Sequence, residues 1–277
     1  MKDVVLLTGC GQIGLAIVRR IGFGKKLVIA DKSIENAKKI NDIFINAGFD
    51  SSYYECDISS KESILNLILE AQKFGPISHF VNAAGVSPSQ ASIETILKVD
   101  LYGTAVLLHE VGKVIKEGGV GITISSQSGK RMKQLTQEED EALALTPYEK
   151  LLDLELLNPK NIKNTLHAYQ LAKRCNEKRV MYEANLWASR GARLNSISPG
   201  IIVTPLAIDE FNGIRGDFYK NMFKKCPAGR PGTADEVGAL AQFIMGPNGS
   251  FICGTDFLID GGATASYYYG LLRERKE

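Results

Sequence analysis

Residues 4–14, Val-Val-Leu-Leu-Thr-Gly-Cys-Gly-Gln-Ile-Gly, decide the fold of this chain. The first five residues predict a buried strand, the glycines predict a tight turn, and the apolar-periodic run through Ile21 predicts a helix. Such a turn lets the backbone approach a pyrophosphate at a helix N-terminus. A glycine turn can also do no more than pack a helix on a strand. The candidate phosphate-binding residues are Gly9, Gly11, Gln12, Ile13 and Gly14.

A second predicted strand, residues 26–30, ends directly before Asp31. An acidic residue about 20 positions beyond the glycine turn is placed to bind the adenine ribose hydroxyls of a dinucleotide. Its carboxylate repels a 2′-phosphate, so Asp31 favours NAD over NADP. Lys32 is the next residue, and its cationic side chain keeps NADP open.

Length and composition indicate one catalytic domain over residues 1–277, since 277 residues suit a single large α/β domain. The net charge is +2 with the basic residues spread out, which favours neither nucleic acid nor a membrane as a partner. The chain starts in a core strand, so we expect no leader. The five cysteines are scattered, which predicts reduced thiols, a cytoplasmic protein and no metal site.

Strand and helix patterns alternate along the whole chain. This alternation predicts a Rossmann-like α/β fold with a doubly wound parallel sheet, whose ligands bind at the carboxyl ends of the strands. Polar or glycine residues stand at five predicted strand ends: Gly9, Asp31, Asp57, Asn82 and Ser126. The predicted helices cover about 33–47, 60–73 and 92–116, and the further strands cover about 52–56, 77–82, 119–126 and 192–198.

Tyr169 and Lys173 stand four residues apart in a stretch that predicts a helix. On a helix, such residues lie on one face. An ammonium beside a phenol favours the phenolate, so we expect Lys173 to lower the pKa of Tyr169 from about 10 toward neutrality. The pair is a candidate proton-transfer device. The spacing is common in helices, so its weight comes from the motifs around it.

Ordered motifs resemble the short-chain dehydrogenase/reductase family from Val4 to about Gly262. Each motif alone is weak, but their order along nearly the whole chain is specific. Besides the glycine turn and the Tyr169–Lys173 pair, the motifs are residues 56–58 (Cys-Asp-Ile), 82–85 (Asn-Ala-Ala-Gly), 126–129 (Ser-Gln-Ser-Gly), 195–204 (Asn-Ser-Ile-Ser-Pro-Gly-Ile-Ile-Val-Thr), 229–232 (Gly-Arg-Pro-Gly) and 260–262 (Asp-Gly-Gly).

The resemblance implies hydride transfer between a nicotinamide and a secondary alcohol or ketone. It implies that Tyr169 is the general acid or base, that Lys173 assists it and that Ser126 donates to the carbonyl oxygen. The further cofactor-binding residues that it implies are Tyr169 and Lys173 again, with Asp57, Ile58, Asn82, Ala83, Ala84, Gly85, Pro199, Gly200, Ile202 and Thr204.

Three departures from the family pattern stand out. Asp100 occupies a position where the family usually has an asparagine implicated in a water relay to the lysine. Aspartate is nearly isosteric, which keeps Asp100 a candidate catalytic residue, but it adds a charge near Lys173 and loses a donor. Residues 85–100 are short for the family, and Ser126 and Tyr169 lie unusually far apart. The last two departures resemble the bacterial 3α-hydroxysteroid dehydrogenase/carbonyl reductase branch, which implies an apolar ketone or hydroxysteroid substrate.

The extra residues form a predicted helical insertion over about 130–166. Capping-box patterns at 136–139 and 146–149, with Pro147 at the first helical position of the second, predict helices over 137–145 and 147–157. Their leucines need a partner, so we expect a cover for the substrate site or a subunit contact. A solvated helical pair is the alternative.

A polar–apolar stretch over about 205–227 predicts a mobile apolar substrate lid, with ordinary core as the alternative. Its apolar residues are Phe211, Phe218, Met222 and Phe223. Family members commonly pair through the two long helices, here about 92–116 and 167–190. An insertion packed there blocks that contact. We therefore expect a homodimer through residues 256–269, rather than the common homotetramer.

Two other function classes stay open at this point. An extended-type sugar epimerase or dehydratase shares the glycine turn and the tyrosine–lysine spacing, but the short chain and residues 254–262 argue against it. A nucleotide-sensing protein without catalysis is the other class. Asp100 is its only support, since Ser126, Tyr169 and Lys173 are all present.

Overall fold

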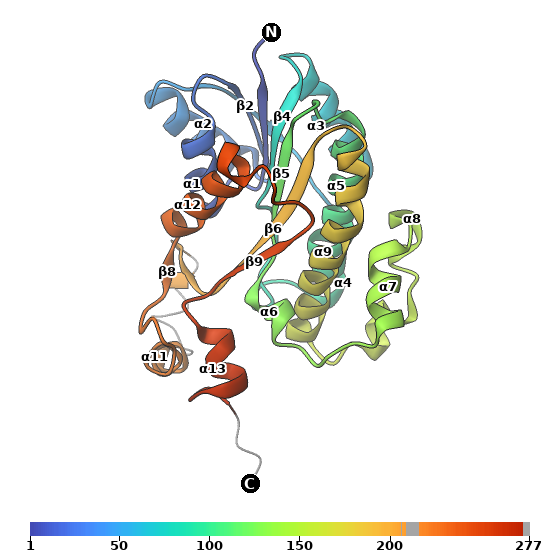
Figure 1. Cartoon of the computed structure of the whole chain (residues 1–277), viewed down its shortest axis with the longest axis vertical. Helices are drawn as coiled ribbons and strands as arrows, with labels where there is room; N and C mark the ends of the chain where they lie inside the picture. The colour runs from blue at the N-terminus through green and yellow to red at the C-terminus, as the bar shows by residue number, and fades with distance from the viewer. Residues whose placement is uncertain (206, 209–215, 274–277) are drawn as a thin grey trace.

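A seven-stranded parallel sheet forms the centre of the computed structural model, which describes residues 1–205, 207–208 and 216–273 (Figure 1). The strand order is β3-β2-β1-β4-β5-β6-β9. The order reverses between β1 and β4, and ligands of such sheets bind outside the strand ends at this point. The strands are β1 (Val4–Thr8), β2 (Lys26–Asp31), β3 (Asp50–Glu55), β4 (Ile77–Asn82), β5 (Val120–Ile124), β6 (Arg193–Pro199) and β9 (Asp256–Ile259). The predicted fold class is confirmed.

Helices cover both faces of the sheet (Figure 1). On one face, α1 (Gln12–Ile21), α2 (Ile34–Asn46) and α12 (Ala234–Met245) share one apolar core with the strands. On the other, α3 (Lys61–Gln72), α5 (Thr104–Val114) and α9 (Thr165–Ala188) share a second core. The central strands such as β1 and β2 are apolar on both sides because both sides are covered, whereas the edge strand β3 is polar and partly exposed.

The predicted helix over 92–116 forms, but its middle is a π-helical segment. It consists of α4 (Ile93–Ile96), the segment η1 (Leu97–Gly103) and α5. Such wider turns recur at functional sites. Here the segment carries Asp100.

Short elements surround the carboxyl ends of the strands. They are α6 (Gln127–Lys130), β7 (Ile202–Val203), β8 (Gly232–Thr233), α11 (Gly216–Lys224) and α13 (Ala263–Tyr269). The predicted lid residue Phe211 and the side chain of Phe218 lie outside the described residues. Met222 is buried and Phe223 half-buried, so this part of the stretch takes part in packing.

The first insertion helix is confirmed, and the second is wrong beyond Leu151. Helix α7 (Gln137–Leu145) starts with the predicted capping box of Thr136 and Glu139. Helix α8 covers only Tyr148–Leu151, and the short 3₁₀ turns η2 (Glu155–Leu157) and η3 (Pro159–Asn161) follow. The second capping box does not form. Thr146 ends α7 in an extended conformation, and Pro147 is at the N-cap position.

Tertiary packing explains this break. Leu143, Leu151 and Leu157 are buried in the same core as α5 and α9, so the whole insertion is packed against the domain. The Arg179 side chain of α9 donates to the carbonyl oxygens of Ala144 and Thr146, which fixes the chain between α7 and α8. The alternative of a solvated helical pair is therefore wrong, and the leucines have the buried partner that was expected.

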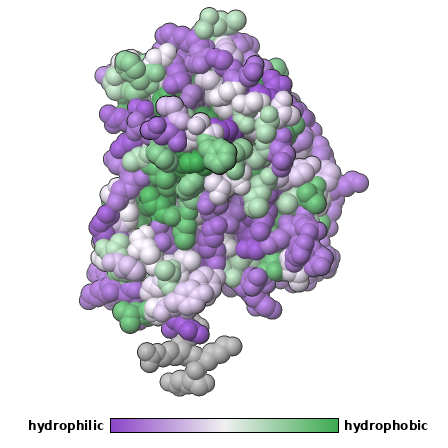
Figure 2. Space-filling model, in the orientation of Figure 1, coloured by the Kyte–Doolittle hydropathy of each residue, from purple (hydrophilic) through white to green (hydrophobic). Residues whose placement is uncertain are grey.

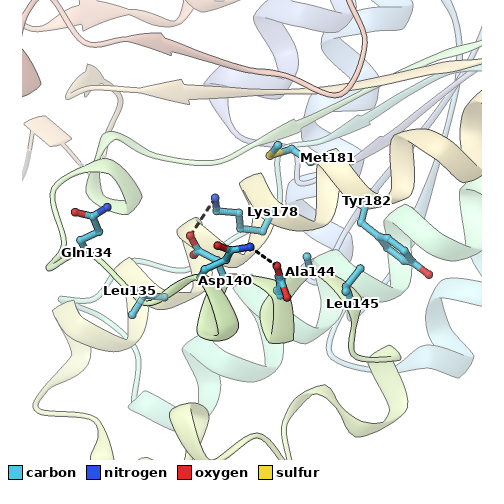
Figure 3. A pocket seen from close by; sticks show the side chains of 10 residues that line it. Gln134, Leu135, Asp140, Ala144, Leu145, Lys178, Met181 and Tyr182 are labelled. Carbon is cyan, nitrogen blue, oxygen red and sulfur yellow. Dashed lines mark hydrogen bonds and ion pairs between the residues drawn. The ribbon is translucent and has the colours of Figure 1, made fainter.

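The insertion flanks the catalytic domain instead of lying across its strand ends (Figure 1). Asp140 of α7 pairs with Arg174 and Lys178 of α9, and Tyr148 of α8 donates to Glu110 of α5 at 2.7 Å. An open groove remains between α7 and α9, lined among others by Leu145, Met181 and Tyr182 (Figure 3). The insertion thus occupies the α5–α9 face.

Candidate active site

The glycine turn between β1 and α1 packs so closely against its neighbours that two of its positions exclude a side chain. Gly9 has a φ of +85°, and a Cβ there would lie 2.3 Å from the backbone nitrogen of Ala84. A Cβ on Gly14 would lie 2.6 Å from the carbonyl oxygen of Gly9. Gly11 is the N-cap of α1, with no side-chain cap and open space around it. The free N–H groups of this helix end suit a pyrophosphate.

Asp31 lies at the end of β2 and is tied to the glycine turn. Its carboxylate accepts from the backbone N–H of Cys10 at 2.8 Å, from that of Ser33 at 3.0 Å and from the Asn36 side chain at 3.0 Å. Asn36 was missed by the sequence analysis, which looked only at strand ends. Burial and the Asp31 charge raise the pKa of the Cys10 thiol to about 12, so this cysteine stays a neutral packing group.

Lys32 points away from the turn and pairs with Asp57 at the end of β3. The ammonium lies 2.8 Å from the Asp57 carboxylate, which also accepts from Ser59. The structure therefore brings Asp31, Lys32 and Asp57 together at the carboxyl ends of β2 and β3. Ile58 is buried in the core beside them.

Asn82 at the end of β4 holds three strand ends together. Its amide group donates to Thr104 at 3.2 Å and Thr123 at 3.1 Å, and its oxygen accepts from Thr8 at 2.9 Å and from the N–H of Ala84. All four contacts are internal, so its side chain positions residues 82–85 rather than reaching outward. Residues Ala83 and Ala84 are half-buried against the glycine turn.

The structure brings Ser126, Tyr169 and Lys173 together. Ser126 follows β5 as the N-cap of α6, where its oxygen accepts from the Ser128 N–H at 3.1 Å. The Ser126 side chain lies close enough to the Tyr169 hydroxyl to lower the pKa of that phenol. The Lys173 ammonium lies 5.3 Å from the centre of the Tyr169 ring and donates to the carbonyl oxygen of Ile124 at 3.4 Å.

Asp100 forms a buried ion pair with Lys173. The carboxylate oxygen lies 3.1 Å from the ammonium, and the two residues are 0% and 4% exposed. The Val86 N–H faces both carboxylate oxygens at 3.3 Å, and a donor there favours the ionised form. Gly85 makes room for the pair, since a Cβ there would lie 2.5 Å from the Asp100 carboxylate.

The expected lowering of the Tyr169 pKa is wrong for this structure. Burial raises the pKa of Tyr169, the Lys173 charge lowers it, and the Asp100 carboxylate raises it again, so the net direction is upward. Burial alone lowers the pKa of Lys173, but Asp100 and Tyr169 raise it, again with a net upward direction. Asp100 thus offsets the charge that was expected to stabilise the phenolate.

The nicotinamide end of the candidate site follows β6. Gly200 is in close contact with the backbone after β9, because a Cβ there would lie 2.7 Å from the Cα atom of Asp260. Pro199 and Ile202 are buried, and the Thr204 hydroxyl accepts from the Ala207 N–H at 3.2 Å. Since β6 pairs with β5, these residues lie on the same edge of the sheet as Ser126.

Ser125 also supports the site, by a route that the sequence analysis did not use. Its hydroxyl donates to the carbonyl oxygen of Lys173 at 2.8 Å and joins the end of β5 to the catalytic helix. Within the described residues there is no group of His, Cys, Asp and Glu side chains that could hold a metal ion. In the same part of the chain, no helix is long and apolar enough to span a membrane.

Comparisons with known proteins identify relatives that match nearly the whole chain. A family model described as enoyl-(acyl carrier protein) reductase matches residues 11–138 and 152–264, leaving out part of the insertion. A short-chain dehydrogenase/reductase, bsc3 of Alternaria brassicicola, is 36% identical and covers 95% of this chain and 96% of its own. The D-threitol dehydrogenase of Mycolicibacterium smegmatis is 27% identical, with 94% of this chain and 92% of its own covered.

The fold also recurs in solved structures. A short-chain dehydrogenase/reductase from Serratia marcescens superposes with a TM-score of 0.74 at 20% identity, covering 95% of this chain and 98% of its own. At that identity the likeness shows the fold alone. Sequence and fold together assign this chain to the short-chain dehydrogenase/reductase family of nicotinamide-dependent enzymes.

Proposed function

We propose that this enzyme transfers a hydride between a nicotinamide dinucleotide and a secondary alcohol or ketone, with Ser126, Tyr169 and Lys173 as the catalytic residues. One observation carries the proposal. The Tyr169–Ser126 contact and the Lys173 ammonium share the carboxyl edge of the sheet with the open N-terminus of α1. A dinucleotide placed with its pyrophosphate at that helix end reaches along the same edge.

The cofactor supplies or accepts the hydride, and the protein moves the proton. In the reducing direction, Tyr169 donates its phenolic proton to the substrate oxygen, which becomes the hydroxyl of the alcohol. Ser126 donates a hydrogen bond to that oxygen as negative charge builds on it. The Lys173 ammonium then stabilises the tyrosinate. In the oxidising direction, each of these roles runs in reverse.

We propose an apolar carbonyl compound as the substrate class, with hydroxysteroids among the candidates. The buried Met222 and the half-buried Phe223 on α11 support an apolar contribution from the stretch that follows Thr204. Cofactor oxidation against a panel of aliphatic ketones, keto-steroids and an α,β-unsaturated acyl thioester tests the assignment. Turnover of the thioester alone would contradict it.

We propose NAD as the preferred cofactor because the Asp31 carboxylate lies beside the glycine turn, where it repels a 2′-phosphate. Lys32 lies in the same region, but it is already paired with Asp57. Asp31→Ala is expected to lower the dissociation constant for NADP, relative to that for NAD, by about tenfold. This corresponds to about 1.4 kcal/mol in the difference between the two binding free energies. Isothermal titration with both cofactors measures the change.

Asp31→Asn is the matched control, because it removes the charge and keeps an acceptor for the Cys10 N–H. If repulsion sets the preference, Asn and Ala have similar effects on the ratio. Lys32→Ala is expected to leave the ratio unchanged. Tighter binding of NADP than of NAD by the unaltered protein would show that the lysine dominates.

We also propose that the chain forms a homodimer through its C-terminal edge. Strand β9 is an edge strand, and apolar side chains gather over α12 and the segment that leads to β9 (Figure 2). The exposed apolar residues of this region include Phe243, Phe251 and Leu258. Exposed apolar edges of this kind favour pairing with a second chain. The alternative α5–α9 face is occupied by the insertion.

Light scattering is expected to give twice the 30.2 kDa mass of one chain. Phe251→Asp combined with Leu258→Asp is expected to shift the mass to that of one chain, because a charge on each apolar contact opposes pairing. Met181→Asp on the opposite side of the molecule is the control. A tetramer that persists after deletion of residues 265–277 would count against both the dimer and this edge.

A cytoplasmic location fits the chemistry of the cysteines. All five are free thiols, and four of them are buried. Unpaired cysteines are typical of reducing compartments. We therefore propose that the enzyme works in the cytoplasm.

A further inference from the structure

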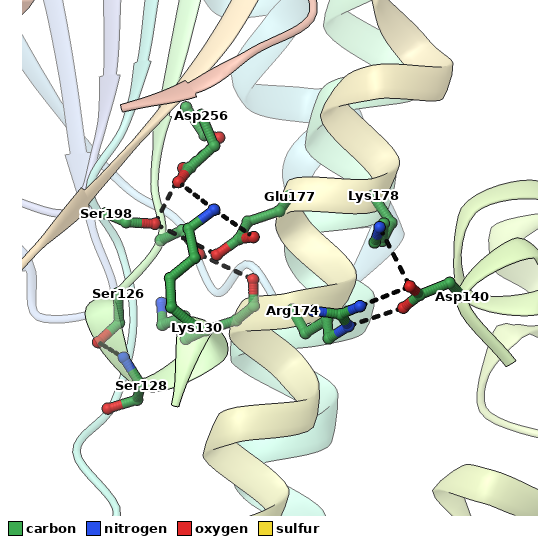
Figure 4. Close-up of polar contacts among 12 residues, drawn as sticks. Ser126, Ser128, Lys130, Asp140, Arg174, Glu177, Lys178, Ser198 and Asp256 are labelled. Carbon is green, nitrogen blue, oxygen red and sulfur yellow. Dashed lines mark hydrogen bonds and ion pairs between the residues drawn. The ribbon is translucent and has the colours of Figure 1, made fainter. Parts of the chain in front are cut away.

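A partly buried charge cluster lies one helical turn beyond Lys173, the proposed catalytic lysine. The Lys130 ammonium of α6 lies 2.8 Å from the Glu177 carboxylate of α9 and 2.9 Å from the Asp256 carboxylate of β9 (Figure 4). Lys130 approaches Oδ2 of Asp256, and Ser196 and Ser198 of β6 both donate to the other carboxylate oxygen, Oδ1, at 2.7 and 2.9 Å. The cluster therefore joins four elements, α6, α9, β6 and β9, and none of its side chains has a role in the proposed proton transfer.

The cluster acts on the element that begins with Ser126. Helix α6 has only four residues, which is too short to be stable by itself. The backbone of α6 lies against α9 at Gly129. A Cβ at that position would lie 2.9 Å from the backbone nitrogen of Arg174 and 3.1 Å from the Glu177 carboxylate. The direction of Ser126 therefore depends on what holds α6 in place.

Lys130 is the last residue of α6, and Ser126 is the N-cap residue at its other end. The backbone of Lys130 also accepts a hydrogen bond from the Tyr268 hydroxyl of α13. Lys130 is thus held through its side chain by α9 and β9 and through its backbone by α13. The α6 end opposite Ser126 is fixed on three sides.

We propose that Lys130, held by Glu177 and Asp256, is a positioning residue that keeps Ser126 directed at Tyr169. The inference rests on the proposed catalytic role of Ser126 and extends it to a group that does not touch the substrate. A hydrogen-bond donor is effective only within a narrow range of positions, so a small shift of α6 weakens its contact with the substrate oxygen.

The charges around Glu177 make the cluster sensitive to pH. Burial and the Asp256 carboxylate raise the pKa of Glu177 to about 7, against the opposing effect of Lys130 and Arg174. Below that pH Glu177 is neutral and its ion pair with Lys130 is lost, so that Asp256 is the remaining partner of the Lys130 ammonium. We therefore expect kcat to fall as the pH decreases below about 7. Glu177→Gln is expected to remove this pH dependence, because glutamine carries no titratable group.

Lys130→Met is expected to lower kcat by about 10-fold to 100-fold, as a misplaced catalytic group does. The KM for the cofactor stays within about threefold, since Lys130 lies away from the glycine turn. Lys130→Arg retains the charge and is expected to restore most of the rate. Lys178→Met is the matched control. Lys178 also lies in an ion pair of α9, but its partner Asp140 is on the insertion (Figure 4).

A double-mutant cycle with Ser126→Ala identifies the route of the effect. If Lys130 acts through Ser126, Lys130→Met lowers kcat by less than about threefold when Ser126 has already been replaced by alanine. A full-sized effect there, or wild-type kcat in Lys130→Met, would overturn the proposal. If Lys130→Met does not fold, Glu177→Gln takes its place in the same cycle.

Hydrogen exchange provides a readout that does not depend on turnover. Amides of residues 126–130 are expected to exchange faster in Lys130→Met than in wild type, whereas those of α1 do not change. Unchanged amide exchange in α6 would overturn the positioning role of Lys130, whether or not a substrate is found. A wild-type enzyme that turns over no carbonyl substrate, with faster exchange in the variant, would instead contradict only the proposed function.

Discussion

Replacing Tyr169 by phenylalanine is expected to lower kcat by about 100-fold to 10,000-fold while the cofactor still binds. The phenol of Tyr169 lies beside Ser126 and can release a proton, which the Ser128 N–H that also contacts Ser126 cannot do. Phenylalanine keeps the ring beside Lys173 and removes only the hydroxyl. Steady-state kinetics and cofactor titration on the same preparation separate lost chemistry from lost binding.

Tyr148→Phe is the matched control for this experiment. It also removes a tyrosine hydroxyl, but that hydroxyl donates to Glu110 under the insertion, away from the strand ends. We expect kcat close to wild type and a loss of about 1 kcal/mol in the free energy of unfolding. If Tyr169→Phe retains turnover within a few-fold of wild type, the assignment of the general acid is wrong.

Lys173→Met is expected to destabilise the folded protein by about 3–5 kcal/mol, in addition to removing activity. The cause is Asp100, which is fully buried and then has no cation beside it. Denaturant unfolding at pH 7 measures the loss. The double variant Lys173→Met/Asp100→Asn is expected to recover a large part of it, because no buried charge remains. No recovery in the double variant would contradict the ion-pair argument.

The pH dependence of the same variant follows from the direction of the Asp100 shift. Burial raises the pKa of Asp100, and loss of Lys173 removes the charge that opposes this. A carboxyl group whose folded pKa lies above its unfolded pKa destabilises the folded state at higher pH. The destabilisation of Lys173→Met therefore shrinks as the pH falls through the raised folded pKa of Asp100.

Asp100→Asn alone checks the influence of the carboxylate on the chemistry. The Asp100 charge raises the pKa of Tyr169, so its removal is expected to lower that pKa. The rise of alcohol oxidation with pH then moves to lower pH in the variant. A pH–rate profile that stays in place would show that the carboxylate does not influence the phenol.

Local sequence signals predicted six of the seven strands of the sheet, but they missed the edge strand β9 (Asp256–Ile259). The apolar run of β1, the glycine turn and the start of α1 depend on neighbouring residues only, because strand period, turn conformation and helix N-terminus are local properties. For the same reason the Tyr169–Lys173 spacing predicted one helix face correctly. The capping box at Thr136 also formed as predicted.

Local signals failed where distant segments compete with them. The pattern from Thr146 to Glu149 resembles a helix start, but the Arg179 side chain of α9 binds the Thr146 carbonyl oxygen, and the helix that follows ends at Leu151. Likewise, the spacing of Tyr169 and Lys173 contains no information about Asp100. Only the fold brings that carboxylate to 3.1 Å from the lysine, and burial of Tyr169 together with the Asp100 charge raises the pKa that was expected to fall.

The sequence by itself therefore determined the family, the parallel sheet and the identity of the catalytic residues proposed here. The tertiary structure alone decided the protonation chemistry of Tyr169, the place of the insertion on the α5–α9 face and the Lys130 cluster behind Ser126. The physical reason is that pKa values and ion pairs depend on burial and on charges from other segments. Periodicity and motif spacing describe only what a segment does with its own neighbours.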